Sequence, residues 1–226
     1  SDWRERFPIF RDAFASLSAA ADVLPRPLSS YVYPEKPSAN DERALEATEV
    51  CQPAMCALGL AAKALLDACG VRAAVSLGHS LGEFAAMASG GALDPQAAVG
   101  LVARRGKVMR ELKLGDAGAM AAVMADAKSV ERAIAGIEGV VLANYNHPRQ
   151  VAISGTTAAV NAACKKLEAQ KIEVRRLAVS HAFHSPVLAG VRPQVERLIA
   201  GVEIGEPSHL IASCIAERAH RDEASI

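Results

Sequence analysis

Aromatic residues are scarce in this sequence, and neither sign of charge is in excess. Phe, Trp and Tyr make up 4% of the 226 residues, whereas hydrophobic residues as a whole make up 51%, largely Ala, Val and Leu. The 25 basic residues balance the 25 acidic ones, and no basic run stands out. This balance argues against nucleic acid or a strongly anionic membrane as a partner.

Long apolar runs and paired cysteines are also missing. No apolar run approaches the roughly 20 residues that a membrane helix needs. The charged start SDWRERFPIF lacks the apolar segment of a signal peptide. The five cysteines include no C-x-x-C pair: Cys51, Cys56, Cys69, Cys164 and Cys214. We therefore expect a protein of the reducing cytoplasm, without a membrane segment, disulfides or a metal site.

The abundant small residues suit an α/β protein, in which helices lie close on a sheet. A helix is predicted to open at Pro8, and the proline-rich segment 25–38 should be neither regular helix nor central strand. A buried helix is predicted from near Pro53 to Gly70, and a short strand over 73–77. After His209 the pattern predicts one strand and then a polar tail.

The segment 117–180 has a different pattern from the rest of the chain. Its elements read as strand 119–125, helix 127–137, strands 140–146 and 150–156, helix 157–170 and strand 172–180. The order β-α-β-β-α-β is the ferredoxin-like arrangement. We therefore predict a ferredoxin-like subdomain over 117–180, carried by a larger, hydrolase-like α/β unit formed by 1–116 and 181–226. A single continuous α/β sheet is the alternative.

The stretch SLGHSLGEFAAMASGG, residues 76–91, runs from a predicted strand through a glycine-rich turn into a helix. Its G-H-S-L-G core has the G-x-S-x-G pattern of a nucleophile elbow, which presents a serine at a sharp strand-to-helix turn. Ser80 would be that nucleophile, and the N–H of Leu81 could donate to a developing oxyanion. A structural turn rich in small residues is the other interpretation.

A serine nucleophile needs a base, and the candidates are His181 and His184 in VSHAFHSPVL. This segment follows the last strand of the predicted subdomain, and catalytic groups are often displayed at strand ends and in loops. Taken alone, both could equally be ordinary loop histidines.

Arg105 lies in the helix that is predicted to begin at Pro95, with Asp94 as its N-cap. Helical spacing places it on one face with apolar residues, namely Ala98, Leu101, Val102, Met109 and Leu112, whereas Arg104 falls on the other side. A buried guanidinium is costly without an anion. Either a protein carboxylate pairs with Arg105, or this residue binds an acidic ligand bidentately.

Four motifs together are similar to those of a known family. GHSLGEFAA, RRGKVM, ANYNHPRQVAISG and VSHAFHSPVL occur here in the order and spacing of acyltransferase domains. These are the malonyl-CoA:acyl carrier protein transacylases and the acyltransferase domains of polyketide and polyunsaturated fatty-acid synthases. The resemblance extends from the FPIFRDAF helix to about Ser213.

The resemblance implies that Ser80 is the acylated nucleophile, that His184 is its base and that His181 takes a non-catalytic place. It implies that Arg105 grips the free carboxylate of the extender unit, and that Leu81 and Phe183 fit a malonyl-selective pattern. The resemblance also includes a family motif near the site, to which we assign only a supporting role; its residues are Asn144, Asn146 and Gln150. The substrate would be malonyl-CoA and the acceptor the phosphopantetheine thiol of an acyl carrier protein, with no metal and no bound cofactor. Adjacent synthase domains, such as a ketosynthase, would be partners.

The sequence departs from the family at both ends. Such domains normally begin with a strand and a motif rich in glycine and glutamine, and they continue past the position of Ile226. We therefore expect a domain that is incomplete at both ends. Two rival functions stay open: a serine esterase or thioesterase that uses the same elbow, and an inactive acyltransferase-like scaffold that serves as a docking module.

Overall fold

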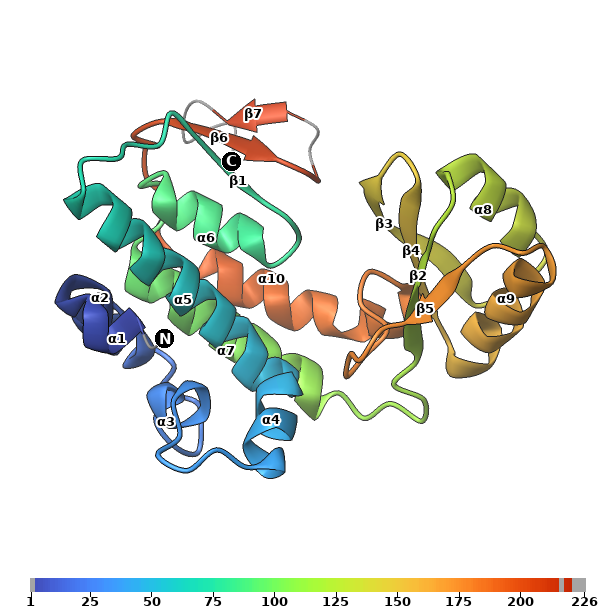
Figure 1. Ribbon diagram of the computed structural model, residues 1–226, viewed down its shortest axis with the longest axis horizontal. Helices are drawn as coiled ribbons and strands as arrows, with labels where there is room; N and C mark the ends of the chain where they lie inside the picture. Colours follow the sequence, from blue (N-terminus) through green and yellow to red (C-terminus); the bar gives the residue numbers. More distant parts are fainter. Residues whose placement is uncertain (1–2, 216–217, 221–226) are drawn as a thin grey trace. The chain divides into compact units, whose positions relative to one another are not determined.

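The computed structural model describes residues 3–215 and 218–220. It divides into two compact units, of which the first is Ser1–Arg110 with Gln194–Ile226 and the second is Glu111–Pro193 (Figure 1). The predicted boundaries, after residues 116 and 180, fall inside the second unit, six residues from its start and thirteen residues from its end. The division into 1–116, 117–180 and 181–226 stays a prediction.

Helices α2 (Pro8–Ser18) and α5 (Thr48–Ala68) pack against each other in the first unit. Phe10, Phe14 and Leu17 recur at helical spacing on α2 and are buried in the core that α2 shares with α5. Figure 1 shows the two helices side by side. The helix predicted to begin at Pro8 is confirmed. The core is completed by α7 (Pro95–Glu111), whose N-cap Asp94 accepts a hydrogen bond from the backbone N–H of Ala97 at 2.8 Å.

The start of α5 is a correction. The helix begins at Thr48, five residues before the predicted start, and Pro53 lies inside it. A proline inside a helix removes one hydrogen bond and crowds the carbonyl group four residues earlier. The full burial of Pro53 in the core offsets this cost. By length and composition α5 is also the one helix among the described residues that could cross a membrane. A core helix passes the same test, and α5 packs against α2, α4 and α6.

The proline-rich segment is less irregular than predicted. It contains the short helix α3 (Leu28–Val32), which begins directly after Pro27, where a proline does no harm. Helix α4 (Ala39–Glu46) follows, and it was not predicted. Its sequence signal was a capping box: the hydroxyl of Ser38 accepts from the backbone N–H of Asp41, and the carboxylate of Asp41 accepts from the backbone N–H of Ser38. The remaining helices near the ends of the described chain are α1 (Trp3–Arg6) and α10 (Arg192–Ala200).

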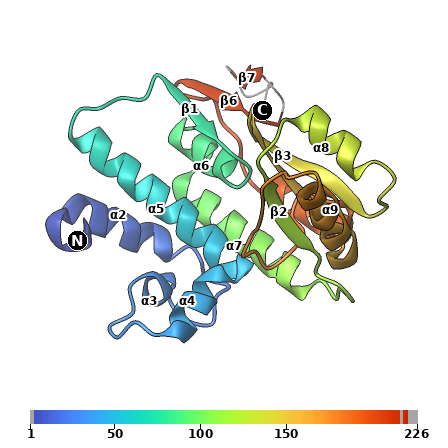
Figure 2. The same cartoon turned by 45° about the vertical axis from the view of Figure 1, so that its right-hand side comes forward.

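The sheet of the first unit is small and positions the serine turn. Its strand order is β1 (Val75–Gly78), β6 (Leu210–Ser213) and β7 (Arg218–His220). β1 and β6 run parallel, with Val75 opposite Leu210 and Gly78 opposite Ser213. Helix α6 (Gly82–Ser89) covers this sheet, and Figures 1 and 2 show it between β1 and α7. β7, antiparallel to β6, corrects the prediction that one strand is followed only by a polar tail; residues 221–226 lie outside the described part.

The second unit has the predicted β-α-β-β-α-β order. Its elements are β2 (Ala119–Val123), α8 (Ala127–Ile134), β3 (Val140–His147), β4 (Gln150–Gly155), α9 (Thr157–Ala169), β5 (Val174–Arg176) and the 3₁₀ helix η1 (Pro186–Val191). The strands form one antiparallel sheet in the order β3-β4-β2-β5, which is the split arrangement of ferredoxin-like folds. Both helices pack on it through fully buried residues such as Val130, Ile153 and Val160.

The last strand of this unit is much shorter than predicted. Only residues 174–176 pair with β2, and the chain then turns, with the N–H of Val179 donating to the carbonyl oxygen of Leu177 at 3.0 Å. The residues that carry the H-A-F-H motif therefore follow a loop and not a strand.

Candidate active site

Ser80 lies at the turn between β1 and α6, with a backbone φ of 54°. A side chain in this left-handed region is strained, and such strain is concentrated at functional sites. Gly78 makes the turn possible, because a Cβ on this residue would lie 1.9 Å from the carbonyl oxygen of Gly82. The N–H of Gly82 donates to the carbonyl oxygen of His79 at 2.9 Å and closes the turn. The strand, the sharp turn and the helix expected of a nucleophile elbow are thus all present.

Glu83 fastens this turn to the neighbouring strand. One of its carboxylate oxygens accepts from the backbone N–H groups of Cys214 at 2.8 Å and Ile215 at 3.1 Å, just beyond the end of β6. The hydroxyl of Ser213 donates to the other oxygen at 3.0 Å. Since β1 and β6 are parallel, their carboxyl ends meet at one edge of the sheet, where active sites of α/β proteins are built. No local sequence signal indicates this long-range contact.

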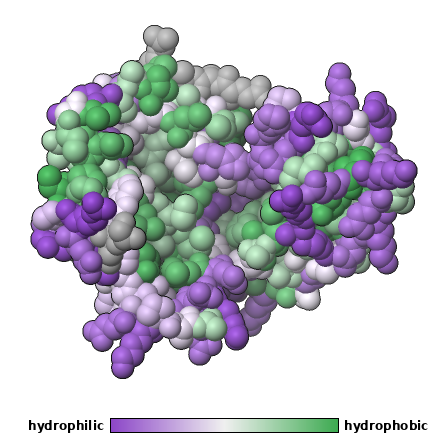
Figure 3. Space-filling model, viewed as in Figure 1, coloured by the Kyte–Doolittle hydropathy of each residue, from purple (hydrophilic) through white to green (hydrophobic). Residues whose placement is uncertain are grey.

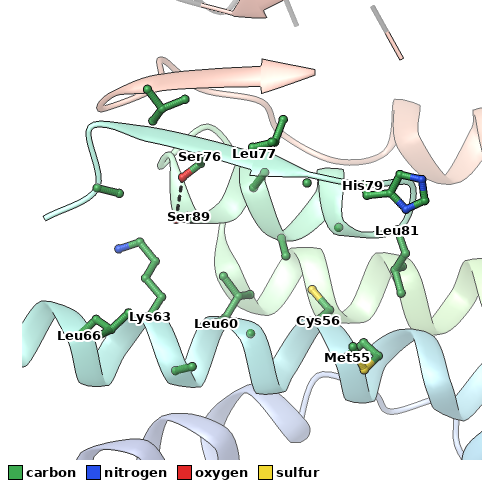
Figure 4. Close-up of a pocket in the computed structure, with 18 residues that line it drawn as sticks. Met55, Cys56, Leu60, Lys63, Leu66, Ser76, Leu77, His79, Leu81 and Ser89 are labelled. Carbon is green, nitrogen blue, oxygen red and sulfur yellow. Dashed lines mark hydrogen bonds between the residues drawn. The ribbon is translucent and has the colours of Figure 1, made fainter. Parts of the chain in front are cut away.

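A groove of about 640 Å³ runs beside the turn, between α5 and β1. Figure 4 shows His79 and Leu81, the two neighbours of Ser80, at one end of it, and Ser76 with its hydrogen-bond partner Ser89 farther along. Figure 3 shows hydrophobic residues gathered on the surface of the first unit. Several hydrophobic residues that line the groove are exposed, namely Met55, Leu66, Val75 and Leu77. Ser80 does not line the groove itself.

The H-A-F-H motif belongs to the second unit and is anchored through its alanine. Ala182 is fully buried, and its N–H donates to the carbonyl oxygen of Ala117 at 2.8 Å. Gly118, with a φ of 76°, makes room for it, because a Cβ on Gly118 would lie 2.5 Å from the Cβ of Ala182. Further hydrogen bonds close a tight turn around this anchor, from the N–H of Phe183 to the carbonyl oxygen of His181 at 2.9 Å and from the hydroxyl of Ser185 to that of Ala182 at 2.8 Å.

His184 follows in this turn with a φ of 57°, and its side chain is exposed. The backbones of His184 and Ser80 thus both lie in the left-handed region. His181 is half-buried, and its Nδ1 lies 3.0 Å from the hydroxyl of Ser180. Its ring centroid is 6.0 Å from that of Phe183. Ser185 caps η1 by accepting from the N–H of Val187, which fixes the backbone directly after His184.

Arg105 is half-buried on α7, whereas Arg104 beside it is exposed, as the helical spacing predicts. Its Nη1 donates to the side-chain oxygen of Gln52 at 2.5 Å, and its Cζ lies 5.8 Å from the centre of the Phe84 ring on α6. Burial lowers the pKa of the guanidinium from its ordinary value. Among the described residues no carboxylate forms an ion pair with Arg105. Within the described residues, Arg105 therefore has no protein carboxylate that neutralises its charge.

Gln52 was missed by the sequence analysis. It is a polar residue in an otherwise apolar stretch of α5 and only 5% exposed. A buried glutamine must satisfy both its oxygen and its nitrogen, so its position within the apolar pattern was the available signal.

Comparison with known proteins identifies the family. Residues 35–223 match the family described as acyl transferase domain, so the chain belongs to the acyltransferase domain family. It is 38% identical over 203 residues to mycoketide-CoA synthase of Mycobacterium tuberculosis, covering 89% of this chain and 5% of that protein. It is 37% identical over 223 residues to phenolphthiocerol synthesis polyketide synthase type I Pks15/1 of Mycobacterium marinum, covering 96% of this chain and 10% of that protein. The chain therefore spans only a small part of these synthases.

Solved structures agree with this assignment. The acyltransferase domain from the second module of the salinomycin polyketide synthase matches with a TM-score of 0.85 and 32% identity, over 97% of this chain and 50% of that one. The malonyl-CoA:acyl carrier protein transacylase of Xanthomonas oryzae matches with a TM-score of 0.85 and 32% identity, over 98% and 70%. A malonyl-transacylase solved with a type II polyketide synthase acyl-carrier protein matches with a TM-score of 0.87 and 29% identity, over 99% and 72%. The resemblance stated from four motifs is confirmed, and so are the fold class and the acyltransferase assignment.

Proposed function

We propose that this domain moves a malonyl unit from coenzyme A to the phosphopantetheine thiol of an acyl carrier protein, through an ester on Ser80. The observation that carries the proposal is the environment of Arg105. A half-buried guanidinium whose side-chain partner is a neutral amide has a positive charge that this partner does not compensate and that a bound carboxylate can. A malonyl group has such a carboxylate, whereas an acetyl group does not.

The first half-reaction begins at the elbow. A ring nitrogen of His184 accepts the proton of the Ser80 hydroxyl as its oxygen attacks the thioester carbonyl carbon of malonyl-CoA. The N–H of Leu81, at the start of α6, donates to the oxyanion that develops. The tetrahedral intermediate then collapses, the carbon–sulfur bond breaks, and the departing thiolate takes the proton from the imidazolium. A malonyl ester of Ser80 and free coenzyme A result.

The second half-reaction reverses these roles. The thiol of the carrier's phosphopantetheine gives its proton to His184 and attacks the ester carbonyl. The carbon–oxygen bond breaks, and Ser80 recovers its proton from His184. No metal or bound cofactor takes part in either step of this scheme.

Specificity and partners follow from the same scheme. Arg105 holds the malonyl carboxylate and disfavours neutral acyl groups, and Leu81 and Phe183 favour malonyl over methylmalonyl. The malonyl-transacylase solved with an acyl-carrier protein supports a carrier as the acceptor. The chain covers only 5% and 10% of the two synthases that it resembles, which supports neighbouring synthase domains as partners. We propose that a ketosynthase is one of them and that the reaction takes place in the cytoplasm.

Transfer of radiolabelled malonyl groups from coenzyme A to a carrier protein tests this proposal. The purified protein should move label to the phosphopantetheine-bearing carrier but not to a carrier without that arm. Label released as free malonate, with none on the carrier, would contradict transfer and favour a thioesterase.

Two side chains can be tested in the same assay. His184→Ala should slow the transfer by about a hundredfold to ten-thousandfold, the usual contribution of a general base. Arg105→Ala should reduce malonyl transfer about tenfold to a hundredfold, whereas acetyl transfer should change much less. Arg104→Ala is the matched control, because Arg104 is exposed and pairs with Asp22 at 3.2 Å. Equal losses of malonyl and acetyl transfer would remove Arg105 from the assigned role.

A further inference from the structure

The buried side chain of Gln52 is hydrogen-bonded at both of its polar atoms. Its oxygen accepts from Nη1 of Arg105 at 2.5 Å. Its nitrogen donates to the hydroxyl of Thr48 at 2.7 Å and to the sulfur of Met109 at 3.3 Å. A guanidinium offers only donors, so the amide oxygen has to face Arg105. The contacts with Thr48 and Met109 therefore fix the amide in the one orientation that supports Arg105.

The backbones of α5 and α7 approach each other closely beside this pair. A Cβ on Gly106 would lie 2.6 Å from the Cα of Glu49 and 2.8 Å from the carbonyl oxygen of Thr48. Such contact is possible only with glycine at this position. It places Arg105, the residue directly before Gly106, within hydrogen-bond distance of the next turn of α5, where Gln52 lies.

The carboxylate one turn before Gln52 on α5 pairs with a different arginine. Glu49, one turn before Gln52, has a side chain that is only 13% exposed, and its carboxylate lies 3.2 Å from Nη1 of Arg110. Arg110 thus supplies the partner of Glu49, and Arg105 is left with the amide. An amide oxygen accepts a hydrogen bond but carries no net charge, so it orients the guanidinium without neutralising it.

We propose that Gln52 is a positioning residue for acyl-group selection: it holds Arg105 by a neutral hydrogen bond, so that the arginine's charge stays available to the carboxylate of an acidic acyl group. This inference rests on the proposed function and adds a determinant of its substrate class. Of the five N–H donors of the guanidinium, the contact with Gln52 occupies one. The others can meet a carboxylate in a bidentate arrangement, whose direction Gln52 sets.

The substitution Gln52→Glu tests the neutral character of the contact. It changes the shape very little but places a carboxylate against Arg105, where it competes with the acyl carboxylate. The ratio of malonyl to acetyl loading, measured as kcat/KM with each coenzyme A ester, should fall about tenfold to a hundredfold, chiefly through a higher KM for malonyl-CoA. Gln52→Met removes the hydrogen bond without adding charge, and it should lower the ratio by a smaller factor.

Gln96→Glu is the matched control. Gln96 is an exposed glutamine on the same helix as Arg105, and its nitrogen donates to the hydroxyl of Ser16 at 2.9 Å. The control adds the same charge away from Arg105, so the ratio should equal that of the wild type. Thermal unfolding of each variant shows whether it is folded. A fold defect would lower the malonyl and acetyl loading rates together, whereas a loss of selectivity changes their ratio.

The outcomes distinguish this inference from the proposed function. Wild-type protein that loads malonyl, together with an unchanged ratio in a folded Gln52→Glu or Gln52→Met variant, would overturn the inference and leave the function standing. Wild-type protein that loads no malonyl group would overturn both. A lowered ratio in the two Gln52 variants, with a wild-type ratio in Gln96→Glu, would support the positioning role.

Discussion

Gly78 and Gly82 meet across the turn at Ser80, so closely that a Cβ on Gly78 would lie 1.9 Å from the carbonyl oxygen of Gly82. The relationship is one-sided, because a Cβ on Gly82 would meet nothing within 4 Å. The two glycines of the G-x-S-x-G pattern therefore have different physical roles. Gly78 permits the close backbone approach, and Gly82 is the first residue of α6.

This difference predicts unequal effects of alanine at the two glycines. Gly78→Ala should lower the free energy of unfolding by about 3 kcal/mol or more, because the clash is with backbone and cannot be relieved by a rotamer change. Gly82→Ala should change it by less than about 1 kcal/mol, since alanine is the better helix former. Urea unfolding followed by circular dichroism measures both. Similar losses in the two variants would show that the turn differs from the one described.

The backbone of Ser80 predicts a second stability effect. At a φ of 54° any residue with a Cβ is strained, by about 1–2 kcal/mol, whereas glycine is not. Ser80→Gly should therefore be more stable than Ser80→Ala by about 1 kcal/mol, although neither variant can be acylated. Equilibrium unfolding of the two variants side by side gives the comparison. Equal stability would mean that residue 80 is not held in the left-handed region.

Asp116 predicts how the second unit responds to acid. Its carboxylate accepts from the N–H of Thr157 at 2.7 Å, from the Thr157 hydroxyl at 2.6 Å and from the N–H of Gly118 at 2.9 Å. These hydrogen bonds, those from Thr157 first, lower the pKa of Asp116 in the folded protein. A depressed folded-state pKa contributes stability above the unfolded value, about 3.9, that is lost as the pH falls through the folded value.

The wild type should accordingly be more stable than Asp116→Asn at pH 6, and the difference should shrink between about pH 5 and pH 2. Thermal unfolding across this range measures it. A difference that stays constant with pH would show that ionised Asp116 does not make these contacts.

Burial predicts the order in which the cysteines react. Cys56 is 2% exposed, and burial raises its pKa to about 12, whereas Cys69 and Cys214 are exposed. At pH 8 only about one Cys56 thiol in ten thousand would be ionised. Iodoacetamide should therefore modify Cys69 and Cys214 first and Cys56 only in urea, as peptide mass spectrometry would show. Early labelling of Cys56 would contradict the packing of α5.

Local sequence pattern was enough for much of this fold. The alternation of short strands and helices after residue 117 predicted the strand-helix order of the second unit. The two glycines around Ser80 predicted a sharp turn, and helical spacing predicted that Arg105 faces inward. Each of these features depends on residues only a few positions apart, which is the range over which periodicity and turn chemistry carry information.

The features that were missed depend on partners far apart in the chain. The contact of Gln52 with Arg105 joins two helices, and that of Glu83 with the end of β6 spans more than a hundred residues. The pairing of β7 with β6 turns a polar segment into a strand. The sequence pattern predicts a helix start near Pro53, yet tertiary packing keeps this residue inside α5. The roles of Ser80, His184, Leu81 and Phe183 stay proposals.

In the proposed reaction, the hydroxyl of Ser80 becomes the carrier of an acidic acyl group. Mass spectrometry of the intact protein after brief incubation with malonyl-CoA, followed by peptide mapping, measures this directly. One added malonyl group on Ser80, absent from Ser80→Ala, is the predicted result. A wild-type protein that stays unmodified, or that carries the group on another residue, would contradict it.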